Sequence, residues 1–251
     1  MENVRTLVYN SNSNFNPKDL EIWSTFSYIN KRLKNYSKGV INMDQLKTGT
    51  TTVGIVCKDG IVLAADMRAT GGHMIADKRA DKVHILNDDF AVTWAGSVSE
   101  AQLITKLIRA ELKLKEIRTN KKTNAKETAN LLGGLIYSSI RRPSMLPGIA
   151  HFLLGGKDTD GIHLYDLFPD GSVTKIPDYV SSGSGSVFAY GVLETKYNKD
   201  MTVKEGIELV KLAVNTALQR DSASGNGINI VVVNQNEVKK VYRKEVSMTL
   251  Y

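Results

Sequence analysis

Apolar and polar residues alternate in short blocks along the chain, and the character of these blocks changes near residue 50. Beyond that point, runs rich in β-branched and aromatic residues are bounded by turn residues, which indicates strands. Lys58-Asp59-Gly60 and Asn87-Asp88-Asp89 are typical hairpin turns between two pairs of such runs. The strands predicted in this way cover residues 51–56, 61–65, 83–86, 90–95, 151–155, 162–167, 172–176, 228–233 and 238–242.

Three stretches instead repeat their apolar residues every three or four positions, which predicts amphipathic helices. Ser97 with Glu100 and Thr202 with Glu205 have the spacing of a capping box, so a helix is expected to begin at each pair. Another helix is expected over about 124–141. The residues expected to face the core are Leu103, Leu107, Ala110 and Leu114 in the first helix, Leu131, Leu132, Leu135 and Ile136 in the second, and Ile207, Val210, Ala213 and Val214 in the third.

The order of the elements is therefore strands, two helices, strands, one helix and strands. Antiparallel hairpins with grouped helices favour an α+β fold, in which two sheets pack together and helices cover their outer faces. The first 45 residues differ, because they are rich in asparagine and serine and contain only a short amphipathic stretch over 19–33. This segment is expected to be an arm that orders only against a partner.

Composition narrows the class of protein. The 251 residues are 42% hydrophobic, enough for a substantial core, and the single cysteine, Cys57, excludes an intrachain disulfide. No apolar run approaches the roughly 20 residues that a membrane helix needs, and the N-terminus lacks the pattern of a signal peptide. The net charge of +7 comes from scattered basic groups without a nucleic-acid-binding motif. A cytoplasmic protein that binds neither nucleic acid nor membrane is expected.

Several common catalytic machineries are absent from the sequence. There is no G-x-S-x-G elbow, and the histidines lack metal-ligand spacing, so no metal site is expected. Cys57 ends a strand and is interpreted as a buried apolar residue rather than a nucleophile. The glycine-serine run at 183–186 lacks a phosphate-binding lysine and reads on its own as a flexible turn.

The junction Gly49-Thr50-Thr51-Thr52 remains. Three threonines entering a strand are explained by β-propensity alone. Here, however, they lie where the arm meets the folded domain. If the Gly49–Thr50 bond were cut, Thr50 would carry both a hydroxyl and a free α-amine, whose pKa near ~8 suits a general base. The junction is therefore a candidate for self-cleavage followed by nucleophilic catalysis.

Collinear motifs over residues 46–251 resemble the proteasome β-subunit family, closest to the archaeal type. The motifs are Thr50 to Gly54, Asp66-Met67-Arg68, Lys82, Ala95-Gly96, the 183–186 run and Arg220 to Gly225. The resemblance implies an Ntn-hydrolase four-layer αββα sandwich. It also implies that residues 1–49 are a propeptide removed autocatalytically between Gly49 and Thr50, and that residues 50–251 form the catalytic domain.

The resemblance assigns roles to individual residues. Thr50 matches the nucleophile, Lys82 and Asp66 a charged pair beside it, and Gly96 the oxyanion donor. Ser184, Asp221 and Ser224 match the group that orients the Thr50 amine. Arg68 is expected beside the Lys82–Asp66 pair and at the substrate, and Thr70 is expected to bind the substrate main chain. The specificity pocket is expected to be formed by Ala69, Ala80, His84, Trp94 and Val98, with Trp94 on its floor, where relatives usually carry a smaller residue.

The resemblance implies a threonine endopeptidase without a cofactor. Its expected partners are other β subunits in a seven-membered ring, α-subunit rings, a regulatory ATPase acting through those rings, and unfolded protein substrates. Three alternatives remain open: a structural β-type subunit that does not cut, a relative of the bacterial two-ring ATP-dependent peptidase, and an unrelated basic binding module.

Overall fold

The computed structural model describes residues 49–144 and 148–246; the predicted arm at 1–48 lies outside the described residues. The elements are β1 (Thr52–Cys57), β2 (Gly60–Asp66), β3 (Ala69–Gly71), β4 (Met74–Asp77), β5 (Val83–Ile85), β6 (Phe90–Gly96), α2 (Val98–Thr119), α3 (Ala125–Ile140), β7 (Ala150–Asp158), β8 (Gly161–Leu167), β9 (Val173–Ile176), β10 (Tyr179–Ser182), α4 (Ser186–Lys196), α5 (Val203–Arg220), β11 (Gly227–Val233) and β12 (Val238–Glu245).

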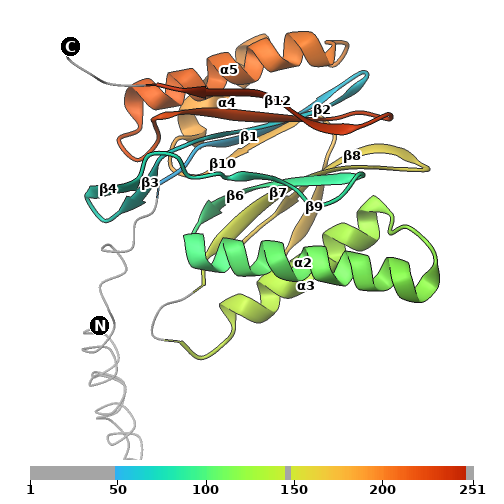
Figure 1. The fold of residues 1–251 in the computed structure, drawn as a ribbon. Helices are drawn as coiled ribbons and strands as arrows, with labels where there is room; N and C mark the ends of the chain where they lie inside the picture. The colour runs from blue at the N-terminus through green and yellow to red at the C-terminus, as the bar shows by residue number, and fades with distance from the viewer. Residues whose placement is uncertain (1–48, 145–147, 247–251) are drawn as a thin grey trace, which may run out of the picture. The chain divides into compact units, whose positions relative to one another are not determined.

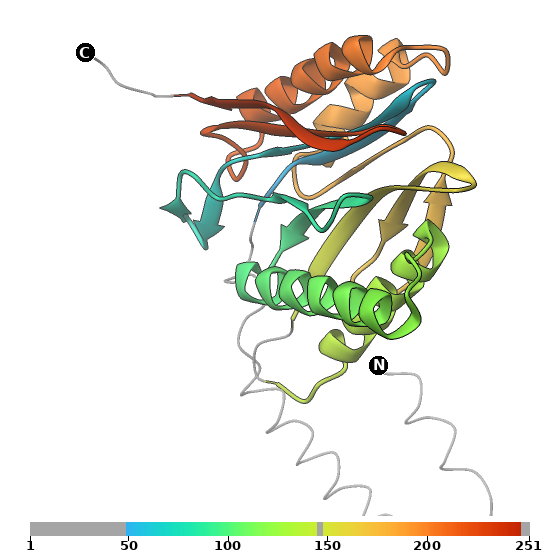
Figure 2. The same cartoon turned by 45° about the vertical axis from the view of Figure 1, so that its right-hand side comes forward.

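The described residues form four layers (Figures 1 and 2). One sheet has the strand order β10-β1-β2-β11-β12 and the other β5-β6-β7-β8-β9, and all neighbouring strands are antiparallel. Helices α4 and α5 cover the first sheet, and α2 and α3 cover the second. The predicted α+β sandwich of two antiparallel sheets flanked by helices is confirmed.

The core consists of three apolar clusters, one at each boundary between layers. Strand β6 contributes side chains to two of these clusters, because successive side chains point to opposite faces of a strand. Phe90, Val92 and Trp94 pack toward α2 and α3, whereas Ala91 between them packs between the two sheets. Strand β2 is buried along its whole length, since its sheet is covered on both faces.

The predicted capping box of Thr202 and Glu205 is confirmed at the start of α5, where each side chain accepts a hydrogen bond from the other residue's backbone N–H. The prediction for Ser97 and Glu100 is wrong. Ser97 precedes α2, but its side chain makes no capping hydrogen bond. The Glu100 carboxylate instead accepts a hydrogen bond from the Ser139 hydroxyl on α3, so it joins two helices rather than closing one.

The face of α2 expected in the core is also wrong. Ala101, Ile104, Ile108 and Leu112 are buried instead. The predicted residues form a second apolar stripe that faces outward: Leu103 is 41% exposed, Leu107 37%, Leu114 42%, and Ile117 extends the stripe with 68%. Periodicity identifies a stripe but cannot choose between two stripes on one helix. In α3 and α5 the predicted faces are confirmed, with Leu131, Leu135 and Ile207 only partly buried.

Four elements were missed from the sequence: β3, β4, β10 and α4. The first three have only three or four residues each. Helix α4 begins at Ser186, the last residue of the 183–186 run, and contains Gly191 in its middle, and the residue at its N-cap, Gly185, provides no side-chain hydrogen bond. The first three residues of the run form the predicted turn, and this turn leads directly into the helix.

Candidate active site

The register of the first sheet gathers the candidate residues around Thr50. Thr52 at the start of β1 lies opposite Ser182 of β10 and Ala65 of β2. Asp66 and Ser184, which follow those partners in the chain, therefore flank the residues just before β1. Strand β11 pairs with β2 so that Ile228 lies opposite Asp66, which brings the end of the 220–226 loop to the same edge.

Thr50 is buried, and its hydroxyl lies between two functional groups. The Oγ1 atom donates a hydrogen bond of 2.6 Å to the carbonyl oxygen of Gly49. Lys82 Nζ lies 2.9 Å from the same Oγ1. Lys82 directly precedes β5 in the second sheet, so the two sheets together position the hydroxyl. The hydroxyl is thus beside an amine and beside the carbonyl of the bond predicted to be cut.

Lys82 and Asp66 form a fully buried ion pair, with Nζ 2.6 Å from Oδ1. Burial lowers the pKa of Lys82 below its ordinary value of 10.5, and the charge of Asp66 opposes this only in part. Burial thus shifts Lys82 toward the neutral form. A neutral amine 2.9 Å from a hydroxyl can accept its proton.

The Asp66 carboxylate accepts three backbone hydrogen bonds besides that of Lys82. Oδ1 accepts from Thr51 N at 3.0 Å, while Oδ2 accepts from Arg68 N at 3.0 Å and from Gly225 N at 2.8 Å. Four donors satisfy a carboxylate that has no access to water. Asp66 therefore holds Lys82 and also fixes the backbone at Thr51, Arg68 and Gly225.

Arg68 lies beside this pair, as expected, but its guanidinium points to the 220–226 loop. Nε donates to Asn226 Oδ1 at 2.8 Å and Nη1 to the carbonyl of Ser222 at 2.7 Å. Its guanidinium packs so tightly on Gly225 that a Cβ there would lie 2.3 Å from it. These contacts brace the loop, and no contact in the described residues supports the predicted position of Arg68 beside substrate.

The structure brings Ser184, Asp221 and Ser224 together. Thr50 N donates to Ser184 Oγ at 3.3 Å, and Ser184 Oγ donates to Asp221 Oδ2 at 2.6 Å. Ser224 Oγ donates to the same oxygen at 2.6 Å. The group thus contacts the backbone nitrogen that would become the α-amine of Thr50 after cleavage.

The packing around Gly49 leaves no room for a side chain. A Cβ at this position would lie 1.7 Å from the Ala223 Cβ and 2.8 Å from Ser184 Oγ. Lack of space therefore requires glycine. Gly49 N also donates to Thr70 Oγ1 at 3.1 Å, and the role of Thr70 in binding substrate main chain stays a prediction.

Gly96 ends β6 opposite Ala150 with φ +114°, and a Cβ would lie 2.3 Å from the Ile149 carbonyl oxygen. Glycine is therefore required there by both conformation and space. Among the described residues, no hydrogen bond joins Gly96 to Gly49 or Thr50, and its role as oxyanion donor stays a prediction.

The predicted pocket residues come from two parts of the fold. Trp94 lies in the apolar cluster under α2, and Val98, the first residue of α2, packs against this cluster. His84 lies opposite Val92 on the same helix-facing side of the sheet. Ala69 and Ala80 are buried outside this sheet, at the start of β3 and shortly before β5. The indole of Trp94 is buried, and its Nε1 has no hydrogen-bond partner among the described residues. The assignment of a pocket to these five residues stays a prediction.

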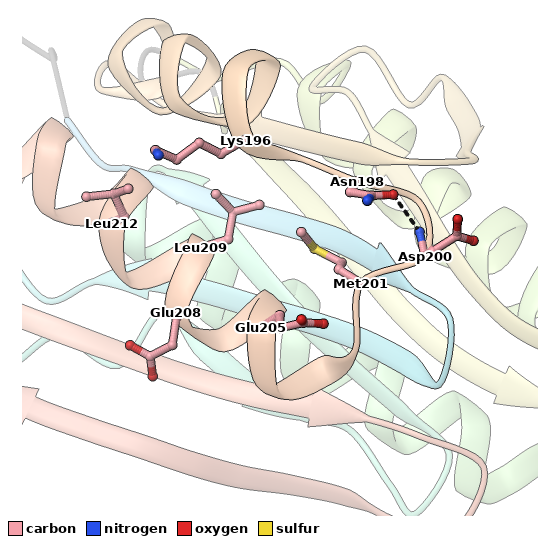
Figure 3. Close-up of a pocket in the computed structure, with 8 residues that line it drawn as sticks. All are labelled: Lys196, Asn198, Asp200, Met201, Glu205, Glu208, Leu209 and Leu212. Atoms are coloured by element: carbon pink, nitrogen blue, oxygen red, sulfur yellow. Dashed lines mark hydrogen bonds between the residues drawn. The ribbon is translucent and has the colours of Figure 1, made fainter.

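The structure also describes the remaining candidate groups. The Cys57 side chain is buried, as predicted, and burial, followed by the charges of Asp59 and Glu205, raises the pKa of its thiol to about 12. No cluster of metal ligands occurs in the part of the chain that the structure describes. None of its described helices could cross a membrane. A surface cavity of about 450 Å³ between α4 and α5, shown in Figure 3, is rimmed by carboxylates and includes none of the candidate residues.

Two residues around Thr50 were missed from the sequence. Thr51 is hydrogen-bonded to Asp66 and Ser224. Asn226, whose own backbone is left-handed with φ 64°, accepts a hydrogen bond from Arg68. The threonine was attributed to β-propensity, and an asparagine before a glycine has the signal of a turn. Neither pattern reveals a hydrogen bond to a residue more than 150 positions away.

Comparison with known proteins agrees with this geometry. A family model described as "Proteasome subunit" matches residues 46–233. The chain is 41% identical over 209 residues to "Proteasome subunit beta" of Methanocaldococcus vulcanius, covering 83% of this chain and 92% of that protein. It is 42% identical over 207 residues to the protein of that name from Ferroglobus placidus, covering 82% and 97%. The Methanopyrus kandleri protein of that name is 42% identical over 195 residues, covering 78% and 91%.

Proposed function

This chain belongs to the proteasome subunit family as a β-type member, and we propose that it is a threonine endopeptidase that exposes Thr50 by cutting its own backbone after Gly49. One observation carries the proposal. The Thr50 hydroxyl contacts both Lys82 Nζ, at 2.9 Å, and the Gly49 carbonyl, at 2.6 Å. A nucleophile, a base and the carbonyl to be attacked thus meet at one buried position.

Self-cleavage begins when Thr50 Oγ1 attacks the Gly49 carbonyl carbon and passes its proton to Lys82. A new C–O bond forms, and the C–N bond breaks as the Thr50 nitrogen takes up a proton from Lys82. The product is an ester between Gly49 and Thr50 with a free α-amine. Water then hydrolyses the ester, with this amine as the base, and residues 1–49 leave. The domain that remains is 50–251.

Peptide hydrolysis repeats these steps on a substrate carbonyl. Thr50 Oγ1 attacks, Lys82 carries the proton to the leaving nitrogen, and an ester to the substrate forms. The α-amine, next to Ser184, activates the water that releases it. In this proposal Thr70, which accepts from Gly49 N, holds the substrate main chain, and Gly96 N stabilises the oxyanion.

Covalent labelling tests the assignment of Thr50. A peptide boronate or vinyl sulfone should modify Thr50 in the assembled protein and abolish peptide hydrolysis, whereas Thr50→Ala should neither react nor hydrolyse peptides. A structural subunit, the competing function, would leave wild type unlabelled. Labelling at another residue, or hydrolysis by Thr50→Ala, would contradict the proposal.

Family membership means assembly with other proteasome subunits, and the finer arrangement belongs to the proposal. It comprises a seven-membered ring of β subunits, α-subunit rings against it, a regulatory ATPase acting through the α rings, unfolded proteins as substrates, and a cytoplasmic location. The outward stripe of α2 supports docking on another subunit. Leu103, Leu107, Leu114 and Ile117 follow the 4-7-3 spacing of a seam between packed helices.

A further inference from the structure

Thr51, the residue after the proposed nucleophile, has its hydroxyl in a buried network. Thr51 and Ser224 are both fully buried, and their hydroxyl oxygens lie 2.7 Å apart. The backbone N–H of Thr51 donates to Asp66 Oδ1, the same atom that contacts Lys82 Nζ. Thr51 is therefore linked to both carboxylates of the site: to Asp66 directly, and to Asp221 through Ser224.

The direction of the hydrogen bond between the two hydroxyls follows from the network. An ionised Asp221 can only accept, and Oδ2 receives hydrogen bonds of 2.6 Å from Ser184 and from Ser224. A hydroxyl has one proton, so Ser224, which gives its own to Asp221, must accept from Thr51. The chain of donors runs from Thr51 through Ser224 to Asp221. It meets there a second chain, from Thr50 N through Ser184.

The packing leaves no freedom for the Thr51 hydroxyl. A Cβ on Gly185 would lie 2.0 Å from Thr51 Oγ1 and 3.2 Å from Asp221 Oδ2, so only glycine at 185 lets the hydroxyl and the carboxylate approach. Gly185 N also donates to the Thr50 carbonyl at 3.3 Å. The 183–186 segment, which contacts Thr50, thus packs directly against the Thr51 side chain.

We propose that Thr51 is a positioning residue whose hydroxyl orients Ser224 and Asp221, and through Asp221 the Ser184 hydroxyl that faces the Thr50 α-amine. This inference rests on the proposed function. Without the Thr51 donor, Ser224 keeps an unpaired buried acceptor and can rotate its hydroxyl away from Asp221. The alignment of Ser184 toward the amine is then lost, while the contacts that hold substrate are unchanged.

The test compares Thr51→Val with Thr52→Val in the assembled, processed protein. The two changes are matched, because Thr52 Oγ1 makes the same kind of buried hydrogen bond, 2.7 Å to Ser182 Oγ, without a link to Asp221. With a fluorogenic peptide, Thr51→Val should lower kcat at least tenfold and change KM less than twofold. Thr52→Val should stay within about twofold of wild type, and Thr51→Ser should recover most of kcat.

A double-mutant cycle with Ser224→Ala separates positioning from general damage to the strand. Since Thr51 acts through Ser224, Thr51→Val should cost little further kcat in the Ser224→Ala background. Additive losses, or equal losses in Thr51→Val and Thr52→Val, would overturn the inference. If Thr51→Val does not assemble, Thr51→Ala takes its place in the cycle. Should Thr50→Ala be inactive while Thr51→Val matches wild type, this inference fails and the proposed function stands.

Discussion

Lys82→Met removes the amine of the proposed base while keeping most of its volume. In the folded protein the change leaves Asp66 buried without its cation, and breaking a buried pair costs roughly 3–5 kcal/mol of unfolding free energy. Three backbone N–H groups still donate to the carboxylate. The desolvation of the Lys82 ammonium, which lowers its pKa, is also removed. We therefore expect a loss near the lower end, about 3 kcal/mol, and a protein that still assembles.

The effect on catalysis should be larger than the effect on folding. A positioned general base contributes roughly 10²–10⁴-fold to a rate, so kcat for a fluorogenic peptide should fall by about that factor. Burial lowers the pKa of Lys82, so its neutral form appears at a lower pH than for a free lysine. Wild-type kcat should rise with pH as Lys82 loses its proton, and Lys82→Met should show no such rise. Any pH dependence that remains belongs to the Thr50 α-amine.

The assay measures kcat against pH for enzyme whose assembly is checked by native mass spectrometry. Lys82→Arg should not restore activity, because a guanidinium stays protonated. Lys122→Met is the matched control, since Lys122 is 65% exposed and pairs with Asp89, which makes no contact with the residues proposed to act in catalysis in the part of the chain that the structure describes. Because processing also uses Lys82, each variant is compared at its observed chain length. An assembled Lys82→Met protein with more than a tenth of wild-type kcat and an unchanged pH profile would refute the reasoning.

Three further changes have defined outcomes. Gly49→Ala places a Cβ 1.7 Å from that of Ala223, so it should slow processing at least tenfold, as followed by intact mass; an unchanged rate would contradict the tight fit. Trp94→Gly should raise cleavage after phenylalanine or tyrosine by about tenfold, or roughly 1.4 kcal/mol in the transition state; no change in preference would place the indole outside the pocket. Leu107→Asp in the exposed stripe of α2 should reduce assembly seen by native mass spectrometry, with the exposed Lys122→Met variant as control; full assembly would exclude this stripe as a docking face.

Local patterns predicted much of the fold. The turn at Lys58-Asp59-Gly60 and the capping box at Thr202 depend on neighbouring residues, and both are confirmed. The outward stripe of α2 was assigned to the core because periodicity alone does not choose between two apolar stripes on one helix. Helix α4 lacks a side-chain cap and contains a glycine, so its sequence carries no start signal.

The candidate site, too, could be predicted only in part from the sequence. The Gly49-Thr50 junction and the residues matched by family resemblance could be found in the sequence, and the structure gathers Thr50, Lys82 and Asp66. The roles of Thr51 and the direction of the Arg68 guanidinium could not be found, because both depend on partners brought near by sheet register. The predicted pocket around Trp94 depends on the orientation of side chains, which the sequence does not determine.

Intact mass of the purified, assembled protein, followed over time after synthesis, tests self-cleavage at Thr50 most directly. The account predicts that the wild-type chain loses residues 1–49 and begins at Thr50 as peptidase activity appears, whereas Thr50→Ala stays at full length under the same conditions. A wild-type chain that hydrolyses peptides while it remains uncut, or a Thr50→Ala chain trimmed after Gly49 in the absence of any active subunit, would contradict it.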